Sequence, residues 1–141
     1  MKILALVDGS ACSEKAIAYV AKNLDCFQGK DGLHLLHVHL QVPGGLARSI
    51  VGMDAIHAYY AEESKAALES SEKMLLEKGI QFQSGYKVGR IEEEVLEYVT
   101  QHGIEMIVMG SHGHGQIKGL VMGSAATRVL TIASVPVLIV R

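Results

Sequence analysis

The stretch Glu105-Met-Ile-Val-Met-Gly110-Ser111-His112-Gly113 is followed, after nine residues, by Gly123-Ser124 and the apolar pattern of residues 125–133. Its first part predicts a short buried strand, and its last part predicts a helix that begins near Gly123. Glycines let the backbone come close to a ligand, and a helix N-terminus offers unpaired N–H groups and a partial positive charge. The stretch therefore predicts an anion site of the kind that holds a nucleotide phosphate.

These glycines have a plainer interpretation as turn and cap residues. Gly110 and Gly123 would suit any joint between strand, loop and helix, but that role does not account for the five glycines that residues 110–123 contain. The sequence contains no Gly-Lys-Ser/Thr, so the stretch is not a Walker-type loop. A dinucleotide fingerprint is also disfavoured, because Gly113-x-Gly115-x-x-x-Gly119 has no acidic residue roughly 20 positions later.

Apolar runs and helical periodicities alternate along the whole chain. Strands are expected at residues 2–7, 33–40, 80–88, 104–109 and 135–140, with a turn at 29–32 and a loop at 41–52. Ser10 or Ser13 is expected to cap the first helix, and Asp54 a long helix that ends near Lys78. This alternation predicts an α/β fold with a parallel sheet. No linker or repeat divides the sequence, so residues 1–141 are expected to form a single domain.

The glycine spacing and its flanks resemble a known family. The spacing Gly110-x-x-Gly113-x9-Gly123-Ser124 is similar to the ATP-binding pattern of the universal stress protein family. Four further segments match that family in order along the chain: Ile3-Leu-Ala-Leu-Val-Asp8-Gly9-Ser10, Leu35-Leu-His-Val38, Val88-Gly89 and Ser134-Val-Pro136-Val-Leu-Ile-Val. A short glycine pattern alone is weak evidence, whereas the pattern with four flanks in order is specific.

The resemblance implies a particular architecture and site. It implies a doubly wound, open five-stranded parallel sheet in the order 3-2-1-4-5 with helices on both faces, an adenine-nucleotide alpha-hydrolase-like fold; pattern alone does not fix this order. A ligand is then expected where the first and fourth strands end, at the switch point of the sheet. The implied contacts with an adenine nucleotide are Asp8, Val38, Met109, Gly110, Gly113, His114, Gly123, Ser124 and Ala125.

Three of these residues have alternative interpretations. The Asp8 carboxylate, after the first strand, can accept hydrogen bonds from a ribose or an adenine amine, or can cap a helix; the resemblance favours the adenosine contact. Val38 ends the second strand, where its backbone would contact the adenine edge, although its side chain indicates only a core residue. His114 stands where the family often has a basic residue, so that, with Lys118, it would face phosphates.

Seven histidines raise a metal hypothesis that their spacing does not support. His37 and His39 point to one face of their strand and His34 to the other. No Cys-x-x-Cys or His-Glu-x-x-His accompanies them, and core packing is the better interpretation of His37. No intrinsic metal site is expected, and Mg²⁺ or Mn²⁺ is more readily explained as a companion of ATP phosphates.

Composition disfavours several classes of protein. The net charge is −2, only 5% of residues are aromatic, and no basic block is present, so a nucleic-acid surface is not supported. No apolar stretch reaches the roughly 18 residues of a membrane span, and Asp8 interrupts the N-terminal apolar run, which argues against a secretory signal. Cys12 and Cys26 lie too far apart along a helix for a disulfide and fit a reducing cytoplasm.

The resemblance therefore implies a cytoplasmic ATP-binding protein that acts as a nucleotide-dependent regulator in a stress response, with an unidentified protein partner. Weak ATP hydrolysis at most is expected, because no positioned base and clamp emerge. A slow ATPase with the same residues and a nucleotide-free interaction module remain as alternatives. Residues 137–140 form an apolar terminal strand, which at a sheet edge would expose unpaired backbone groups. The family pairs this strand across a dimer axis, so the resemblance implies a homodimer.

Overall fold

The computed structural model describes residues 1–27, 32–42, 52–114 and 122–141. In chain order its elements are β1 (Ile3–Leu6), α1 (Ala11–Asn23), β2 (Leu33–His39), α3 (Met53–Glu77), β3 (Gln83–Val88), α4 (Ile91–His102), β4 (Met106–Gly110), α5 (Ser124–Ile132) and β5 (Val137–Val140). The turn expected at 29–32, the loop expected at 41–52 and Lys118 lie wholly or mostly outside the described residues.

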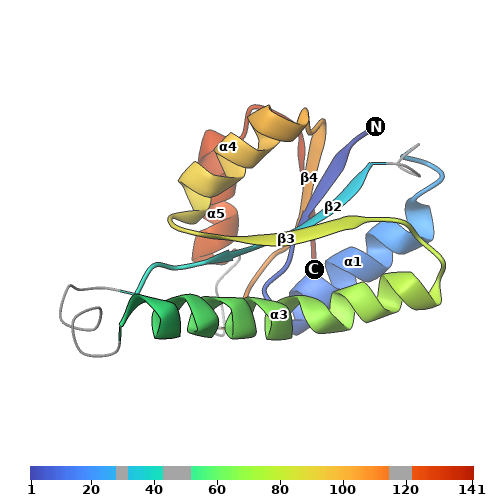
Figure 1. Ribbon diagram of the computed structural model, residues 1–141. Coiled ribbons are helices and arrows are strands. Elements are labelled where there is room, and N and C mark those ends of the chain that lie inside the picture. The colour runs from blue at the N-terminus through green and yellow to red at the C-terminus, as the bar shows by residue number, and fades with distance from the viewer. Residues whose placement is uncertain (28–31, 43–51, 115–121) are drawn as a thin grey trace.

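The strands form one parallel sheet in the order β3-β2-β1-β4-β5 (Figure 1). This confirms the predicted α/β class and the 3-2-1-4-5 order. Leu6, at the end of β1, lies opposite Leu36 of β2 on one side and Met109 of β4 on the other. Because the chain first winds from β1 towards β3 and then returns to add β4 and β5, the carboxyl ends of β1 and β4 flank the switch point of the sheet.

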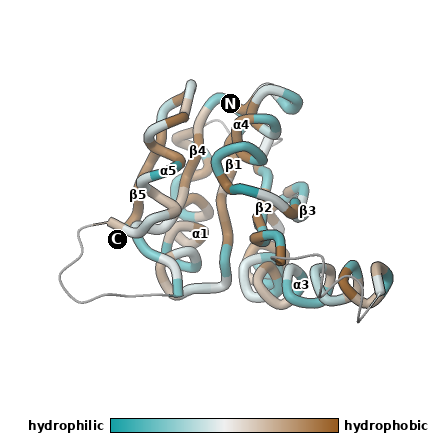
Figure 2. The backbone as a smooth tube through the Cα atoms, turned by 90° about the vertical axis from the view of Figure 1, so that its left-hand side faces the viewer, coloured by the Kyte–Doolittle hydropathy of each residue, from teal (hydrophilic) through white to brown (hydrophobic). Residues whose placement is uncertain are grey.

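Helices cover both faces of this sheet. Ile3 and Ala5 pack against residues of α1 and α3, whereas Leu4 and Leu6 pack against residues of α4 and α5. Figure 1 shows the two helix pairs on opposite sides, and Figure 2 shows apolar colour running along β1 and β4 in the centre. The run Ile3-Leu-Ala-Leu is apolar at every position because successive side chains of a strand face opposite layers, and here both layers are core.

The helix ends follow local chemistry, with one departure from expectation. Ser10 caps α1, and its side-chain oxygen accepts the Ser13 N–H at 3.3 Å. Asp54 does not cap α3, because the N-cap is Gly52, with φ 85°, and Asp54 lies in the first turn. The predicted cap was wrong because a glycine has no side chain by which an N-cap can be recognised in a sequence. Among the described residues, no helix combines the length and the apolar character needed to cross a membrane.

Candidate functional site

A pocket opens at the carboxyl edge of the sheet, where β1, β2 and β4 end and α5 begins. Most of the predicted contact residues line it: Asp8, Val38, Met109, Gly110, Gly113, Gly123 and Ala125. His114 lines an adjoining hollow together with Asp8 and Gly9. Ser124 is the first residue of α5 and is exposed. The fold thus brings residues from both ends of the sequence to the switch point.

The Asp8 carboxylate is held in a defined orientation. Its Oδ1 atom accepts the Ser10 N–H at 2.9 Å, which closes a tight turn between β1 and α1. Its other oxygen, Oδ2, faces Gly113, where an added Cβ would lie only 2.5 Å away. Ser10 rather than Asp8 is the N-cap of α1, so the simple capping interpretation of Asp8 is wrong. Glycine at position 113 is therefore required for the Asp8 carboxylate to occupy its place.

The other two glycines of the site have structural duties that the sequence did not reveal. A Cβ on Gly110 would lie 2.7 Å from the Cys12 backbone carbon, so this glycine allows α1 to pack against the end of β4. Gly123 donates its N–H to the Ser111 carbonyl at 2.8 Å. A Cβ there would lie 3.2 Å from His112 Cα. Gly123 therefore seats the start of α5 directly against the backbone that follows β4.

The N-terminus of α5 supplies the positive end of a helix dipole to the pocket. Gly123 is the N-cap, and no side chain caps it. Ala125 and Ala126, in the first turn, line the pocket. Because the first N–H groups of a helix lack intrahelical partners, this end of α5 suits an anionic group.

The pocket also contains residues whose role the sequence analysis missed. His37 donates its Nδ1–H to the Val7 carbonyl at 2.8 Å and lines the pocket instead of serving only as core. Burial lowers the pKa of His37 more than the Val7 hydrogen bond raises it, which favours the neutral form of the ring. Ile91 adds an apolar wall from the start of α4, and the buried Ser111 adds a hydroxyl. The available signal was position near the carboxyl edge, because Ser111 directly follows β4, Ile91 comes three residues after β3 and His37 lies two residues before the end of β2.

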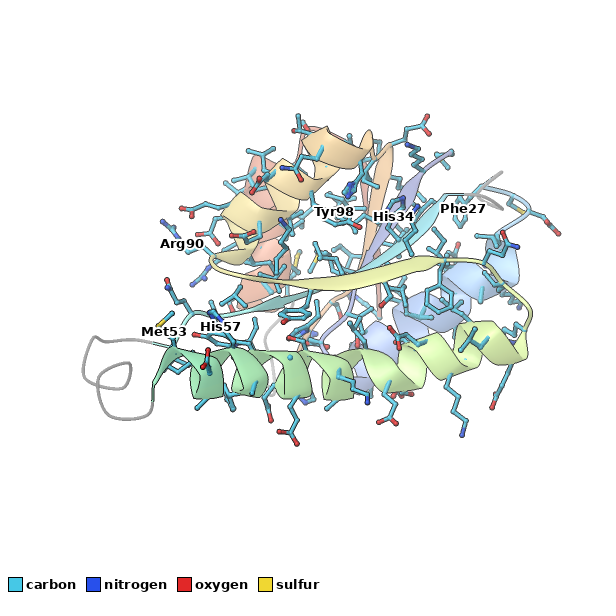
Figure 3. All side chains as sticks on the ribbon, viewed as in Figure 1. Phe27, His34, Met53, His57, Arg90 and Tyr98 are labelled. Carbon is cyan, nitrogen blue, oxygen red and sulfur yellow. The ribbon has the colours of Figure 1, made fainter. Side chains whose placement is uncertain are left out.

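The remaining histidines of β2 are held by the protein itself. His34 lies between β2 and α4, where its Nδ1 is 3.1 Å from the Tyr98 hydroxyl oxygen (Figure 3). His39 has its Nδ1 2.7 Å from the Leu40 carbonyl oxygen. His37 and His39 share one face and His34 occupies the other, as predicted. In the part of the chain that the structure describes, no group of three or more His, Cys, Asp or Glu side chains is arranged to hold a metal ion.

Comparison with known proteins identifies the family. A sequence model of the universal stress protein family matches residues 1–141. The chain belongs to the universal stress protein family. Universal stress protein YxiE of Bacillus subtilis is 30% identical over 151 residues, which cover 99% of this chain and 98% of YxiE. Universal stress protein Slr1230 of Synechocystis sp. is also 30% identical, but the chain spans only 42% of its length.

Solved structures in the family share the fold. The structure of MJ0577 matches with a TM-score of 0.80 and 28% identity, covering 99% of this chain and 94% of that one. The Archaeoglobus fulgidus universal stress protein in complex with dAMP has a TM-score of 0.68 at 19% identity, over 100% and 98% of the two chains. An Arabidopsis thaliana universal stress protein family protein with AMP bound has 0.66 at 15% identity, over 99% and 90%. The last two likenesses show the fold alone.

Proposed function

We propose that this universal stress protein binds ATP in the pocket at the carboxyl edge and acts as a nucleotide-dependent regulator in a stress response, with residues 1–141 working as one domain. The observation that carries the proposal is the convergence of residues from the ends of β1, β2 and β4 and the start of α5 on one pocket. The AMP and dAMP complexes of structural neighbours support it. A cytoplasmic location belongs to the same proposal, and the absence of a disulfide between Cys12 and Cys26 fits it.

The residues of the pocket fit the parts of an adenine nucleotide. Apolar side chains such as Leu6, Met109 and Ile91 offer walls for a flat base. The Asp8 carboxylate is a hydrogen-bond acceptor for ribose hydroxyls or an adenine amine. Phosphates fit beside Gly113 and the N-terminus of α5, where backbone can approach closely and the helix dipole favours negative charge. Mg²⁺ or Mn²⁺ would then bind with the phosphates, which supply oxygen ligands.

This proposal can be tested by measuring the ATP affinity of Gly113→Ala by calorimetry. Gly113→Ala places a Cβ where the Asp8 carboxylate now lies, so we expect ATP affinity to fall at least about tenfold, or about 1.4 kcal/mol. Gly85→Ala is the matched control, because a Cβ there meets nothing within 4 Å. Unchanged ATP affinity in Gly113→Ala would remove the pocket from consideration. Mass spectrometry of small molecules released from purified protein should also detect an adenine nucleotide.

Binding without rapid turnover is the second part of the proposal. Arg128, one turn into α5, has its Nη1 4.0 Å from Glu92 Oε2 and faces a carboxylate of its own protein. Asp8 Oδ1 is engaged with the Ser10 N–H. A phosphotransferase uses a positioned base and a cationic clamp, with turnover of about 1–100 per second. Phosphate release in the presence of Mg²⁺ should be far slower. A rate of about 1–100 per second that is lost in Gly113→Ala would instead favour an enzyme that hydrolyses ATP in this pocket.

The third part of the proposal is a homodimer through β5. This strand is an edge of the sheet, and its four residues are half-buried. The carbonyls of Pro136 and Val140 accept N–H groups of Ile107 and Ser111, so alternation turns the backbone groups of Val137 and Ile139 outward. Antiparallel pairing with a second copy would satisfy these groups and close at two chains.

Sedimentation tests the dimer with a matched pair of variants. Ile139→Pro removes an outward N–H and should shift the protein to monomer, whereas Ile139→Ala keeps that N–H and should remain dimeric. Wild-type protein that sediments as a monomer at high concentration, with and without ATP, would contradict this part of the proposal.

A further inference from the structure

The His114 side chain makes a hydrogen bond with the protein backbone. Its Nε2 lies 2.7 Å from the carbonyl oxygen of Asp8. Because a carbonyl only accepts, Nε2 must carry the proton and donate it. This contact joins the segment after β4 to the end of β1, two parts of the chain that are distant in sequence.

A second histidine, His37 of β2, makes a hydrogen bond with the carbonyl of Val7, the residue before Asp8. His37 donates its Nδ1–H to the Val7 oxygen at 2.8 Å. The carbonyls of two successive residues, Val7 and Asp8, are therefore each held by a histidine from a different element. The end of β1 is thus fixed from the β2 side and from the β4 side.

The turn that follows Val7 and Asp8 is closely packed. Gly9 has φ +77°, a conformation that favours glycine, and a Cβ there would lie 3.3 Å from Ala67 Cα and 3.7 Å from His114 Nε2. The Asp8 carboxylate is bounded by the Ser10 N–H on one oxygen and by Gly113 on the other. Gly113 directly precedes His114, so the same short segment contacts both the carboxylate and the carbonyl of Asp8.

We propose that His114 is a positioning residue, which ties the glycine-rich segment to the end of β1 and so sets the Asp8 carboxylate for the base and ribose of a nucleotide. This inference rests on the proposed function. It differs from the expectation that His114 faces phosphates, because its Nε2–H is directed to Asp8. The proposal predicts that His114 changes the affinity for the adenosine part of a ligand through Asp8, without contacting the ligand itself.

Parallel titrations with ATP and adenosine separate the two roles. His114→Ala should weaken both ligands by the same factor, about three- to tenfold, the value of one hydrogen bond. His114→Gln retains a side-chain N–H donor and should restore most of both affinities. His57→Ala, at an exposed position on α3 (Figure 3), is the matched control and should change neither.

Each outcome bears on one of the two proposals. If His114→Ala weakens ATP and leaves adenosine unchanged, His114 contacts phosphates and the inference is wrong. It is equally wrong if neither affinity changes, or if His114→Gln restores nothing. If the wild-type protein binds neither ligand, the proposed function itself fails and this inference fails with it. Nitrogen NMR gives a direct check on the contact, because the nitrogen that carries the proton facing the backbone carbonyl should be Nε2 in His114 and Nδ1 in His37.

Discussion

The two halves of β2 each hold a histidine, and the two side chains have different partners. Towards the amino end, His34 is 3% exposed, lies 3.1 Å from the Tyr98 hydroxyl, and has its ring centre 5.4 Å from that of His102. At the carboxyl edge, His37 is half-buried, donates to the Val7 carbonyl and lines a pocket. One histidine is enclosed by helix side chains, whereas the other fixes backbone next to an open site.

A lowered histidine pKa therefore does not by itself mark the end of a sheet at which a pocket opens. Burial lowers the pKa of His34, with the charges of His102 and Lys2 adding to the effect, and burial also lowers the pKa of His37. What distinguishes the two is the partner and the space beside it. We therefore expect removal of the His34 side chain to act on stability and removal of the Asp8 side chain to act on ligand binding.

The largest effect should come from Gly110, a pocket residue that serves packing. Gly110→Val places a Cβ 2.7 Å from the Cys12 backbone, where no side chain can move aside. The free energy of unfolding, measured with urea, should fall by about 3 kcal/mol. Gly85→Val, in the edge strand β3 with open space around it, should stay within about 0.5 kcal/mol of wild type. Similar stabilities for the two variants would show that α1 does not depend on this close approach.

The next largest effects come from His34→Ala and Asp8→Ala, which should act on different properties of the protein. His34→Ala should lower the free energy of unfolding by about 2–3 kcal/mol, because it leaves a cavity and an unpartnered Tyr98 hydroxyl, while ATP affinity stays within about twofold. Asp8→Ala should weaken ATP about tenfold or more and change stability by less than about 1 kcal/mol. If both variants lose ATP binding equally, the proposed division between the two ends is wrong.

The pH dependence of stability should follow the buried histidines. The folded-state pKa of His34 is lowered below 6.5, so the unfolded chain binds more protons between that lowered pKa and 6.5. Stability is therefore present above pH 6.5 and is lost as the pH falls below it. Urea titrations at pH 7.5 and 5.0 should show this loss in the wild type, and a smaller loss in His34→Gln. An equal loss in both proteins would assign the effect to other groups, such as His37.

The smallest effect is expected for Arg128→Ala. Arg128 is exposed and its approach to Glu92 is long, so its removal should change the free energy of unfolding by less than about 0.5 kcal/mol. ATP affinity should also stay close to that of wild type. A tenfold loss of ATP affinity measured by calorimetry would instead identify Arg128 as a phosphate clamp, and would extend the site along α5.

The fold could be predicted in outline because buried apolar residues recur along the sequence with the spacing of a strand or a helix. Apolar runs gave the strands, and the resemblance gave their order. The third strand was expected from residue 80 but begins at Gln83, because Ile80 and Phe82 pack on the core before the strand pairs with β2. Periodicity reports burial, whereas a strand boundary depends on backbone pairing with another segment.

The site could be predicted where residues directly follow strand ends, and less well where tertiary contacts decide. Asp8, Val38 and Gly113 meet at one pocket because parallel strands end at a common edge. The packing duty of Gly110 depends on α1 lying opposite, which no local pattern records. The contact between the His114 ring and the Asp8 carbonyl depends on tertiary packing in the same way, and the place of His114 beside phosphates stays a prediction.

Amide NMR of the full chain during titration with ATP shows directly whether the nucleotide binds at the carboxyl edge of the sheet. The pocket at the carboxyl edge should respond, so the largest shifts should fall on residues 8–10, 37–39, 110–114 and 123–126. Amides near His34 and His102, at the other end of the sheet, should move little. Shifts concentrated at that amino end, or no shifts at saturating ATP, would contradict the account.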